Sequence, residues 1–197
     1  MKKLAILLAI APLAGCIKFT APPPSSLLTL TAGVSVPVGE TRSGATAASI
    51  TVLTPQVPQE LATTRVPVQA TPTQIAYVRE AQWVEQPSRL FARLLADTLT
   101  ARTGRLVLSQ RQSLADSGTV LSGELCSFGV LAATREAVVV YDATLMRAAT
   151  TGPANVYERR RFEARVPVSA IEPRPVGLAL NEAANRVAED VAAWVGN

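Results

Sequence analysis

The sequence contains no histidine among its 197 residues. This absence excludes nucleophile systems that use histidine as a base, and it excludes histidine-containing metal sites. Cysteine is almost as scarce, because Cys16 and Cys126 are the only two. The chain also lacks an apolar run of about twenty residues, the length that a membrane-spanning helix needs. It has no Gly-x-Ser-x-Gly elbow, phosphate-binding loop or dinucleotide fingerprint. The absence of these residues and motifs argues against the common classes of enzyme and favours a binding role.

The first sixteen residues have the pattern of a bacterial lipoprotein signal. A basic start is followed by an apolar run over Leu4–Pro12 and by Leu13-Ala14-Gly15-Cys16, which resembles the lipobox that is cleaved before a lipid-modified cysteine. We therefore predict a signal peptide at residues 1–15 and a lipidated Cys16 that anchors the chain to a membrane. The alternative is an ordinary signal peptide that ends in cysteine. In enterobacteria an aspartate after the cysteine favours inner-membrane retention, so Ile17 favours a periplasm-facing lipoprotein of the outer membrane.

Charge and the remaining cysteine narrow the choice of partners. Loss of Lys2 and Lys3 with the signal would lower the net charge from +4 to +2. No basic cluster is interleaved with aromatic residues, so we expect no nucleic-acid partner. With Cys16 lipidated, Cys126 has no disulfide partner, and a zinc site built from thiolates is excluded. Cys126 is then either a small buried apolar residue or a reactive or intermolecular thiol. We expect no cofactor and no metal.

The mature chain divides into a tether and one domain. Residues 16–26 contain Pro22-Pro23-Pro24 and predict a stiff, extended tether. Residues 27–197 predict a single domain, with a mobile loop at residues 31–49. Prolines such as Pro67 are typical of edge strands and loops, and Gly123 and Gly129 indicate bulges. The predicted strands are Leu27–Leu30, Ile50–Leu53, Arg65–Gln69, Gln74–Arg79, Leu106–Leu108, Thr119–Leu131, Ala137–Met146 and Tyr157–Val168.

Two long helices are predicted where apolar residues recur with helical spacing. The first begins near Pro87, which suits a first turn, and stops at Gly104. The second covers Pro175–Val195. The predicted buried faces are Leu90, Phe91, Leu94, Leu95, Thr98 and Leu99 in the first helix, and Leu180, Ala184, Val187, Ala188, Val191 and Val195 in the second. The last three strands should form an antiparallel meander. We therefore predict an α+β fold with an antiparallel or mixed sheet and both helices on one face.

A few residues are candidates for contacts with other molecules. Trp83 precedes the first helix and is either a core anchor or a partner contact. Arg159, Arg160 and Arg161 lie on an alternating strand, so Arg160 should face away from its neighbours. These arginines are either solvated, or paired with Glu136, Glu158 and Glu163, or they contact anionic lipid headgroups or an acidic partner. The carboxylates Asp116, Glu124 and Asp142 have no visible base or metal companion, so we assign no catalytic residue.

Several stretches of the chain resemble one known family. After the lipobox and tether come Leu27-Leu28-Thr29-Leu30, Ile50-Thr51-Val52 and Pro58-Gln59-Glu60-Leu61. Gln82-Trp83-Val84-Glu85-Gln86-Pro87 leads into the first helix, and Leu121-Ser122-Gly123-Glu124-Leu125-Cys126-Ser127-Phe128 and Ala193-Trp194-Val195 follow later. Together they resemble the ABC-type transport auxiliary lipoproteins, which accompany MCE-type intermembrane lipid transporters.

The resemblance implies a non-enzymatic accessory protein. Such a protein would dock onto the periplasmic end of an MCE-domain assembly, and the ring symmetry of these assemblies would accommodate a homo-oligomer. The sequence leaves two other hypotheses open. One is an independent lipid carrier with its own apolar cavity, and the other is an envelope hydrolase, for which no acid–base pair is visible.

Overall fold

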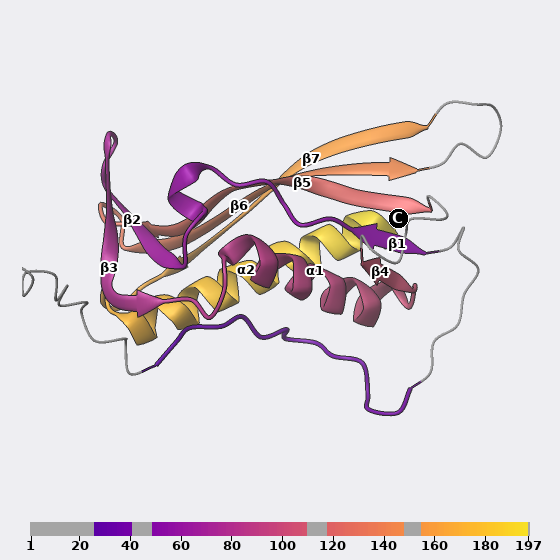
Figure 1. Cartoon of the computed structure of the whole chain (residues 1–197), viewed down its shortest axis with the longest axis horizontal. Helices are drawn as coiled ribbons and strands as arrows, with labels where there is room; N and C mark the ends of the chain where they lie inside the picture. Colours follow the sequence, from indigo (N-terminus) through magenta and orange to yellow (C-terminus); the bar gives the residue numbers. More distant parts are fainter. Residues whose placement is uncertain (1–25, 41–48, 110–117, 148–154, 197) are drawn as a thin grey trace, which may run out of the picture.

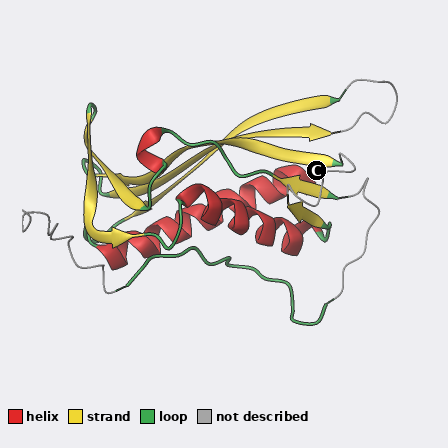
Figure 2. Cartoon of the chain, viewed as in Figure 1, coloured by secondary structure: helices red, strands yellow, loops and turns green. Residues whose placement is uncertain are grey.

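The computed structural model describes residues 26–40, 49–109, 118–147 and 155–196. Within these residues, seven strands form one mixed sheet and two long helices lie side by side on one of its faces (Figures 1 and 2). The predicted α+β class and the placement of both helices are therefore confirmed. The predictions for residues 1–25, including Cys16, lie outside the described residues.

Three long strands form the body of the sheet. They are β5 (Thr119–Leu131), β6 (Glu136–Arg147) and β7 (Val156–Pro167), and each is antiparallel to the next, as predicted. The other edge of β5 has different neighbours at its two ends. At its start it pairs in parallel with β1 (Ile50–Val52), which also pairs with β4 (Val107–Ser109). At its end it pairs in parallel with β2 (Arg65–Thr71), which forms a hairpin with β3 (Gln74–Gln82).

The helices follow the local signals of the sequence. Helix α1 (Pro87–Thr103) has Pro87 in its first turn, and Gly104 ends it in the left-handed conformation with its N–H bonded to the Thr100 carbonyl. Only glycine adopts this conformation at little cost. Helix α2 (Pro173–Gly196) begins two residues before the predicted start. The predicted apolar residues of both helices are buried, and buried alanines let α2 lie close to the sheet.

Four aromatic rings fill the space between α1 and the sheet. Trp83 lies against Phe128 with ring centroids 5.4 Å apart, and Phe91 of α1 contacts Phe128 at 6.5 Å and Tyr141 at 5.3 Å. These are tilted or edge-on arrangements, which aromatic pairs prefer. The Tyr141 hydroxyl donates a 2.9 Å hydrogen bond to the Ser122 carbonyl, so this polar group is satisfied inside the core.

The prediction for the segment before β1 was wrong in one respect. Only Leu28 pairs there, in an isolated parallel bridge to Trp83, so residues 27–30 are not a strand of the sheet. Residues 27–36, which we call the strap, run extended along the side of the helices that faces away from the sheet (Figure 1). Its even-numbered side chains are partly buried, and Leu28, Leu30 and Ala32 pack against the core.

Side chains of α2 replace a neighbouring strand as hydrogen-bond partners of the strap. Asn181 Oδ1 accepts the Thr31 N–H at 2.8 Å, and Asn185 Oδ1 accepts the Gly33 N–H at 2.7 Å. Asn185 Nδ2 also donates to the Thr31 carbonyl at 2.9 Å. Leu28 packs on Gly177, where a Cβ would lie 2.7 Å from Leu28 Cδ2. The first part of the predicted loop at residues 31–49 is therefore an ordered extension of this segment.

Two details of the sheet differ from prediction. The ladder between β5 and β6 is irregular between Leu125 and Ser127, whereas the bulges were predicted at Gly123 and Gly129. Both glycines instead permit close backbone approach, because a Cβ at Gly123 would lie 2.2 Å from the Asp142 carbonyl oxygen. Pro67 lies in β2, which is flanked by β3 and β5 and is not an edge strand. Its missing N–H is tolerated because pairing with β5 starts only at Val68.

Candidate functional site

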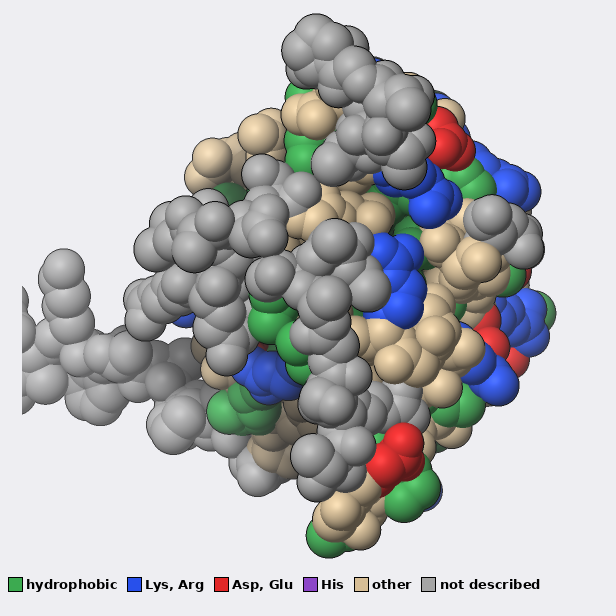
Figure 3. Space-filling model, turned by 90° about the vertical axis from the view of Figure 1, so that its right-hand side faces the viewer, with side chains coloured by type: hydrophobic (Ala, Val, Ile, Leu, Met, Phe, Trp, Pro, Cys, Tyr) green, Lys and Arg blue, Asp and Glu red, His purple; other side chains and the backbone are tan. Residues whose placement is uncertain are grey.

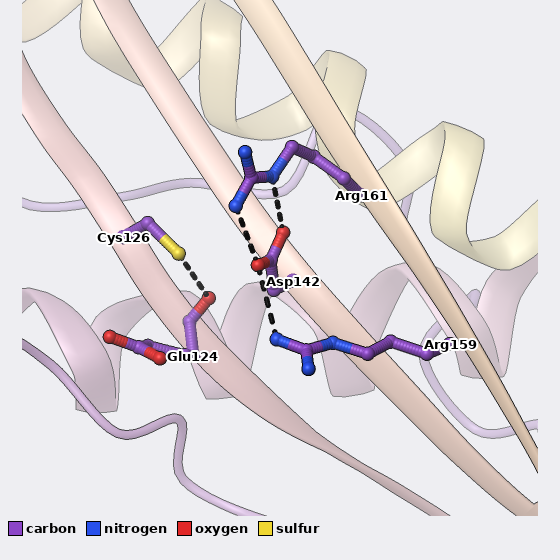
Figure 4. A network of polar contacts seen from close by, with 5 residues as sticks. All are labelled: Glu124, Cys126, Asp142, Arg159 and Arg161. Carbon is purple, nitrogen blue, oxygen red and sulfur yellow. Dashed lines mark hydrogen bonds and ion pairs between the residues drawn. The ribbon is translucent and has the colours of Figure 1, made fainter.

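The arginine run of β7 is divided between the two faces of the sheet. Arg159 and Arg161 lie on the face away from the helices, where Asp142 of β6 stands directly opposite Arg161 (Figure 4). Arg161 binds the Asp142 carboxylate through two contacts, Nε to Oδ1 at 2.6 Å and Nη2 to Oδ2 at 2.7 Å. Arg159 adds a third contact, Nη2 to Oδ2 at 3.3 Å. Two cations therefore share one carboxylate.

The predicted partners of these arginines were wrong. Glu158 pairs with Arg147 at 3.4 Å, and Arg165 binds both Glu163 at 2.6 Å and Glu136 at 3.5 Å. The actual partner, Asp142, was considered only as a candidate catalytic carboxylate. The sequence did contain a signal for the pairing, because Asp142 is the one acidic residue inside the apolar run of β6.

The Asp142 carboxyl is held in its ionised form. Its side chain is only 9% exposed, and burial by itself would raise its pKa. The hydrogen bonds from Arg161 are the larger effect, so they lower the pKa of Asp142 below its usual value, and Asp142 raises the pKa of Arg161 in return. A carboxylate bound in this way accepts hydrogen bonds and has no free proton to donate near neutral pH. This arrangement is suited to holding β6 and β7 together.

Cys126 lies on the same face, at the irregularity of β5 (Figure 4). It is half-buried, and its Sγ lies 3.6 Å from the Glu124 carbonyl oxygen. Burial raises the pKa of the thiol, and the charges of Asp142 and Glu124 raise it further. The reactive form of cysteine is the thiolate, so this environment disfavours the reactive form of Cys126.

Arg160 faces the helix side of β7, as the alternation predicts. Its guanidinium carbon lies 5.2 Å from the centre of the Phe162 ring, and that ring lies 5.5 Å from Trp194 of α2. These residues line a groove of about 380 Å³ between β7 and α2, together with Asp190 and Ala193. Arg160 has no ion pair with any described residue, in contrast to both of its neighbours.

Trp83 is in the core in this structure. Its side chain is 1% exposed, and its backbone N–H donates to the Thr64 carbonyl at 2.8 Å. The indole Nε1 is buried, and no described residue accepts a hydrogen bond from it. The arrangement matches the core anchor of the sequence analysis, and the ring is not available for a surface contact. Partner contact by the three arginines stays a prediction.

Other cationic side chains gather at the end of the molecule where the C terminus lies (Figure 3). A groove at this end is lined by Arg102, Arg105, Arg147 and Glu189. Each arginine already binds within the fold: Arg102 to Glu189 at 2.6 Å, Arg105 to Thr119 at 2.8 Å, and Arg147 to Glu158. These contacts tie the helices and strands to one another.

The described residues contain no group of three or more acidic or cysteine side chains placed to hold a metal ion. Among the described residues, no side chain beside Glu124 or Asp142 could act with it as a catalytic base. Asp116 lies outside the described residues. Among the described helices, none combines the length and the apolar character needed to cross a membrane.

Comparison with known proteins identifies the family. The model of the family described as ABC-type transport auxiliary lipoprotein component matches residues 29–192. The chain belongs to this family. Membership associates this auxiliary lipoprotein with ABC-type transport and with the cell envelope. The match includes most of the strap, the sheet and most of α2, and it confirms the resemblance found in the sequence.

Solved structures show the same fold at low sequence identity. A crystal structure of a Xanthomonas campestris protein of the DUF330 family has a TM-score of 0.67 and 17% identity, over 86% of this auxiliary lipoprotein and 94% of that chain. A crystal structure of an uncharacterized protein has a TM-score of 0.65 and 12% identity, over 86% and 99% of the two chains. Among curated protein sequences, none matches the chain.

Proposed function

We propose that this auxiliary lipoprotein is a non-enzymatic, membrane-anchored component of an ABC/MCE-type intermembrane phospholipid transporter. It would be attached through lipid on Cys16, preferably to the outer membrane, and would dock onto the periplasmic MCE-domain assembly. The observation that carries the proposal is the family match over residues 29–192. The signal and lipobox pattern in the first sixteen residues of the same chain agrees with it.

The position of the strap supports an oriented attachment. The strap begins where Leu28 meets Trp83 and Gly177, near the start of α2. This is the end of the sheet that carries the β5–β6 turn, and the C terminus lies at the opposite end (Figure 1). A tether of ten residues reaches at most about 35 Å when fully extended. The end where the strap begins would therefore stay near the membrane, and the opposite end would be presented to a partner.

Packing of the interior disfavours the independent lipid carrier. A carrier needs an apolar cavity of its own, but the space between α1 and the sheet is occupied by Trp83, Phe91, Phe128 and Tyr141. The grooves of the described residues open to solvent and include charged side chains such as Glu60, Arg102 and Arg160. These properties suit a protein that binds another protein.

Purification from native membranes tests the proposal. The lipoprotein is gently solubilised, crosslinked and captured, and the proteins and phospholipids recovered with it are identified. We expect an MCE-domain protein, and we expect it to be lost when Cys16→Ala removes the anchor. Cys126→Ala is the matched control, because it removes the other cysteine and should leave recovery unchanged.

Two results would contradict the proposal. Recovery of the lipoprotein alone with one phospholipid per chain would favour the independent carrier. Equal recovery of the MCE-domain protein with Cys16→Ala would show that lipidation at this residue is not needed for docking.

A further inference from the structure

Strand β7 has a long free edge. Among the described residues it pairs with β6 alone, over twelve consecutive residue pairs without a register shift. The other outer strands of the described sheet are less open. β4 has three residues, the β2–β3 ladder has two register shifts, and Leu28 covers the end of β3. Long regular edges are templates for pairing with another chain, and proteins usually interrupt or cover them.

Two hydrogen bonds show which backbone groups of β7 face outward. The Val168 N–H donates to the Arg135 carbonyl at 2.8 Å, so even-numbered residues pair with the β6 side. The Arg165 carbonyl accepts a 3.4 Å hydrogen bond from Arg186 of α2, so odd-numbered residues face the free edge. This direction alternates along a strand. The outward N–H and C=O groups are therefore those of Tyr157, Arg159, Arg161 and Glu163, and no strand of the described part of the chain pairs with them. Arg186 covers the edge only at its far end.

The groove beside β7 would receive side chains of an added strand. Side chains of a strand alternate between two faces, so half of those on a strand paired to β7 would point toward α2. There they would meet Phe162, Ala193 and the partly exposed Trp194. A free strand edge beside a helix, with a pocket for alternate side chains, is the arrangement by which several domains bind extended peptides.

The charges indicate what kind of segment would bind. On the outer face, Arg159 and Arg161 share the single carboxylate of Asp142, which leaves an excess positive charge. On the groove side, Arg160 has no ion pair among the described residues, but Asp190 and Glu163 also line the groove, so this side has no excess positive charge. Opposite charges on directly paired strand residues stabilise a sheet, and like charges destabilise it. Carboxylates on the incoming strand would therefore be favoured on the outer face, beside Arg159 and Arg161.

We propose that the free edge of β7 binds an extended acidic segment of a partner protein as an additional strand. The segment would bond to the outward backbone groups of residues 157–163, place apolar side chains against Phe162 and Trp194, and place carboxylates beside Arg159 and Arg161. This inference deepens the proposed function by naming the docking surface, and it rests on that function only for the identity of the partner. The surface lies toward the end of the sheet opposite the start of the strap.

A synthetic peptide of alternating glutamate and valine tests the edge directly. The isotope-labelled lipoprotein in detergent micelles is titrated with this peptide, and amide hydrogen exchange is measured along β7. Without peptide, the odd-numbered amides of residues 157–163 should exchange fast. With peptide, they should become protected, while the even-numbered amides remain slow throughout.

Two substitutions at position 159 distinguish the effect of backbone pairing from the effect of side-chain charge. Arg159→Pro removes an outward N–H and should weaken peptide binding at least tenfold. The β6–β7 ladder should stay intact, because edge strands tolerate proline where the N–H points outward. Arg159→Ala, the matched control, keeps that N–H and should bind within about threefold of the wild type, because one exposed ion pair is weak. Slow even-numbered amides in the proline variant verify that it is folded.

Three outcomes would overturn the inference. The first is that Arg159→Pro and Arg159→Ala bind the glutamate–valine peptide equally well. The second is that the glutamate–valine peptide does not bind, or binds no more tightly than a lysine–valine peptide. The third is concentration-dependent protection of the odd-numbered amides without peptide, which would show that a second copy of the chain occupies the edge. None of these outcomes bears on recovery of an MCE-domain protein from membranes, so this inference and the proposed function can fail separately.

Discussion

Asn185 should control whether the strap stays on α2. Asn185→Ala removes the acceptor of the Gly33 N–H at 2.7 Å and the donor to the Thr31 carbonyl at 2.9 Å. With a net contribution of about 1 kcal/mol for each hydrogen bond, the free energy of strap opening should fall by about 2 kcal/mol. Alanine is the better helix former by about 0.6 kcal/mol, so global stability should fall by only about 1.5 kcal/mol. The strap should therefore open more often than in the wild type, while the domain remains folded.

Amide hydrogen exchange of Gly33 measures this opening. A loss of about 2 kcal/mol corresponds to exchange about thirty times faster, whereas amides in the middle of β6 should change only with global stability. Glu182→Ala is the control, because Glu182 lies on the same helix and binds Arg186, which does not contact the strap. The reasoning is refuted if Gly33 exchanges equally fast in wild type and Asn185→Ala, since the two hydrogen bonds would then not hold the strap.

Three further perturbations test the sheet and its outer face. Arg161 lowers the pKa of Asp142 in the folded state. This ion pair therefore stabilises the fold at pH values above 3.8, the ordinary pKa of aspartate, and the stabilisation is lost as the pH falls through the pKa of the folded state. Asp142→Asn should therefore cost about 1.5 kcal/mol in urea unfolding at pH 7, and a difference that does not shrink below pH 3.8 would contradict the assignment. Gly123→Ala should lower the free energy of unfolding by about 2 to 3 kcal/mol, because the new Cβ would lie 2.2 Å from a carbonyl oxygen. Gly196→Ala is the control, because the nearest atom to its new Cβ is 3.9 Å away. Its free energy of unfolding should stay within about 0.5 kcal/mol of the wild type, as is usual for surface substitutions. Cys126 should be alkylated at pH 8 more slowly than free cysteine, because its pKa is raised above 9.0, and urea should abolish the difference.

The elements with complete local signals were predictable from the sequence. Helix α1 has a proline at its start, a glycine at its end and an apolar face of helical period, and its bounds and buried residues agree with the prediction. The meander was equally clear, because β7 alternates apolar and charged residues over Phe162–Val168. In both cases the information lies within one segment, and packing against the rest of the fold reinforces it.

The parts that were missed depend on residues far apart in the chain. The strap alternates like a strand, and its partner Asn185 follows Thr31 by 154 residues. Asp142 could be matched to Arg161 only once the register of β6 and β7 was known, because a shift of one residue would place it on the other face. Pro67 looked like an edge residue because the sequence does not show that β5 exchanges one neighbour for another along its length.

The strap determines the orientation that the proposed docking would require. If Cys16 carries the lipid, an attached strap leaves about ten residues between the anchor and the fold, a reach of at most about 35 Å. Detaching residues 27–36 would double that length and would free the domain to rotate, so the β7 edge would no longer point away from the membrane. Asn185→Ala should then weaken recovery of a membrane-embedded partner, and binding of the glutamate–valine peptide in micelles should be unchanged. An equal loss in both measurements would mean that Asn185 acts on the β7 edge itself and not on the geometry of attachment.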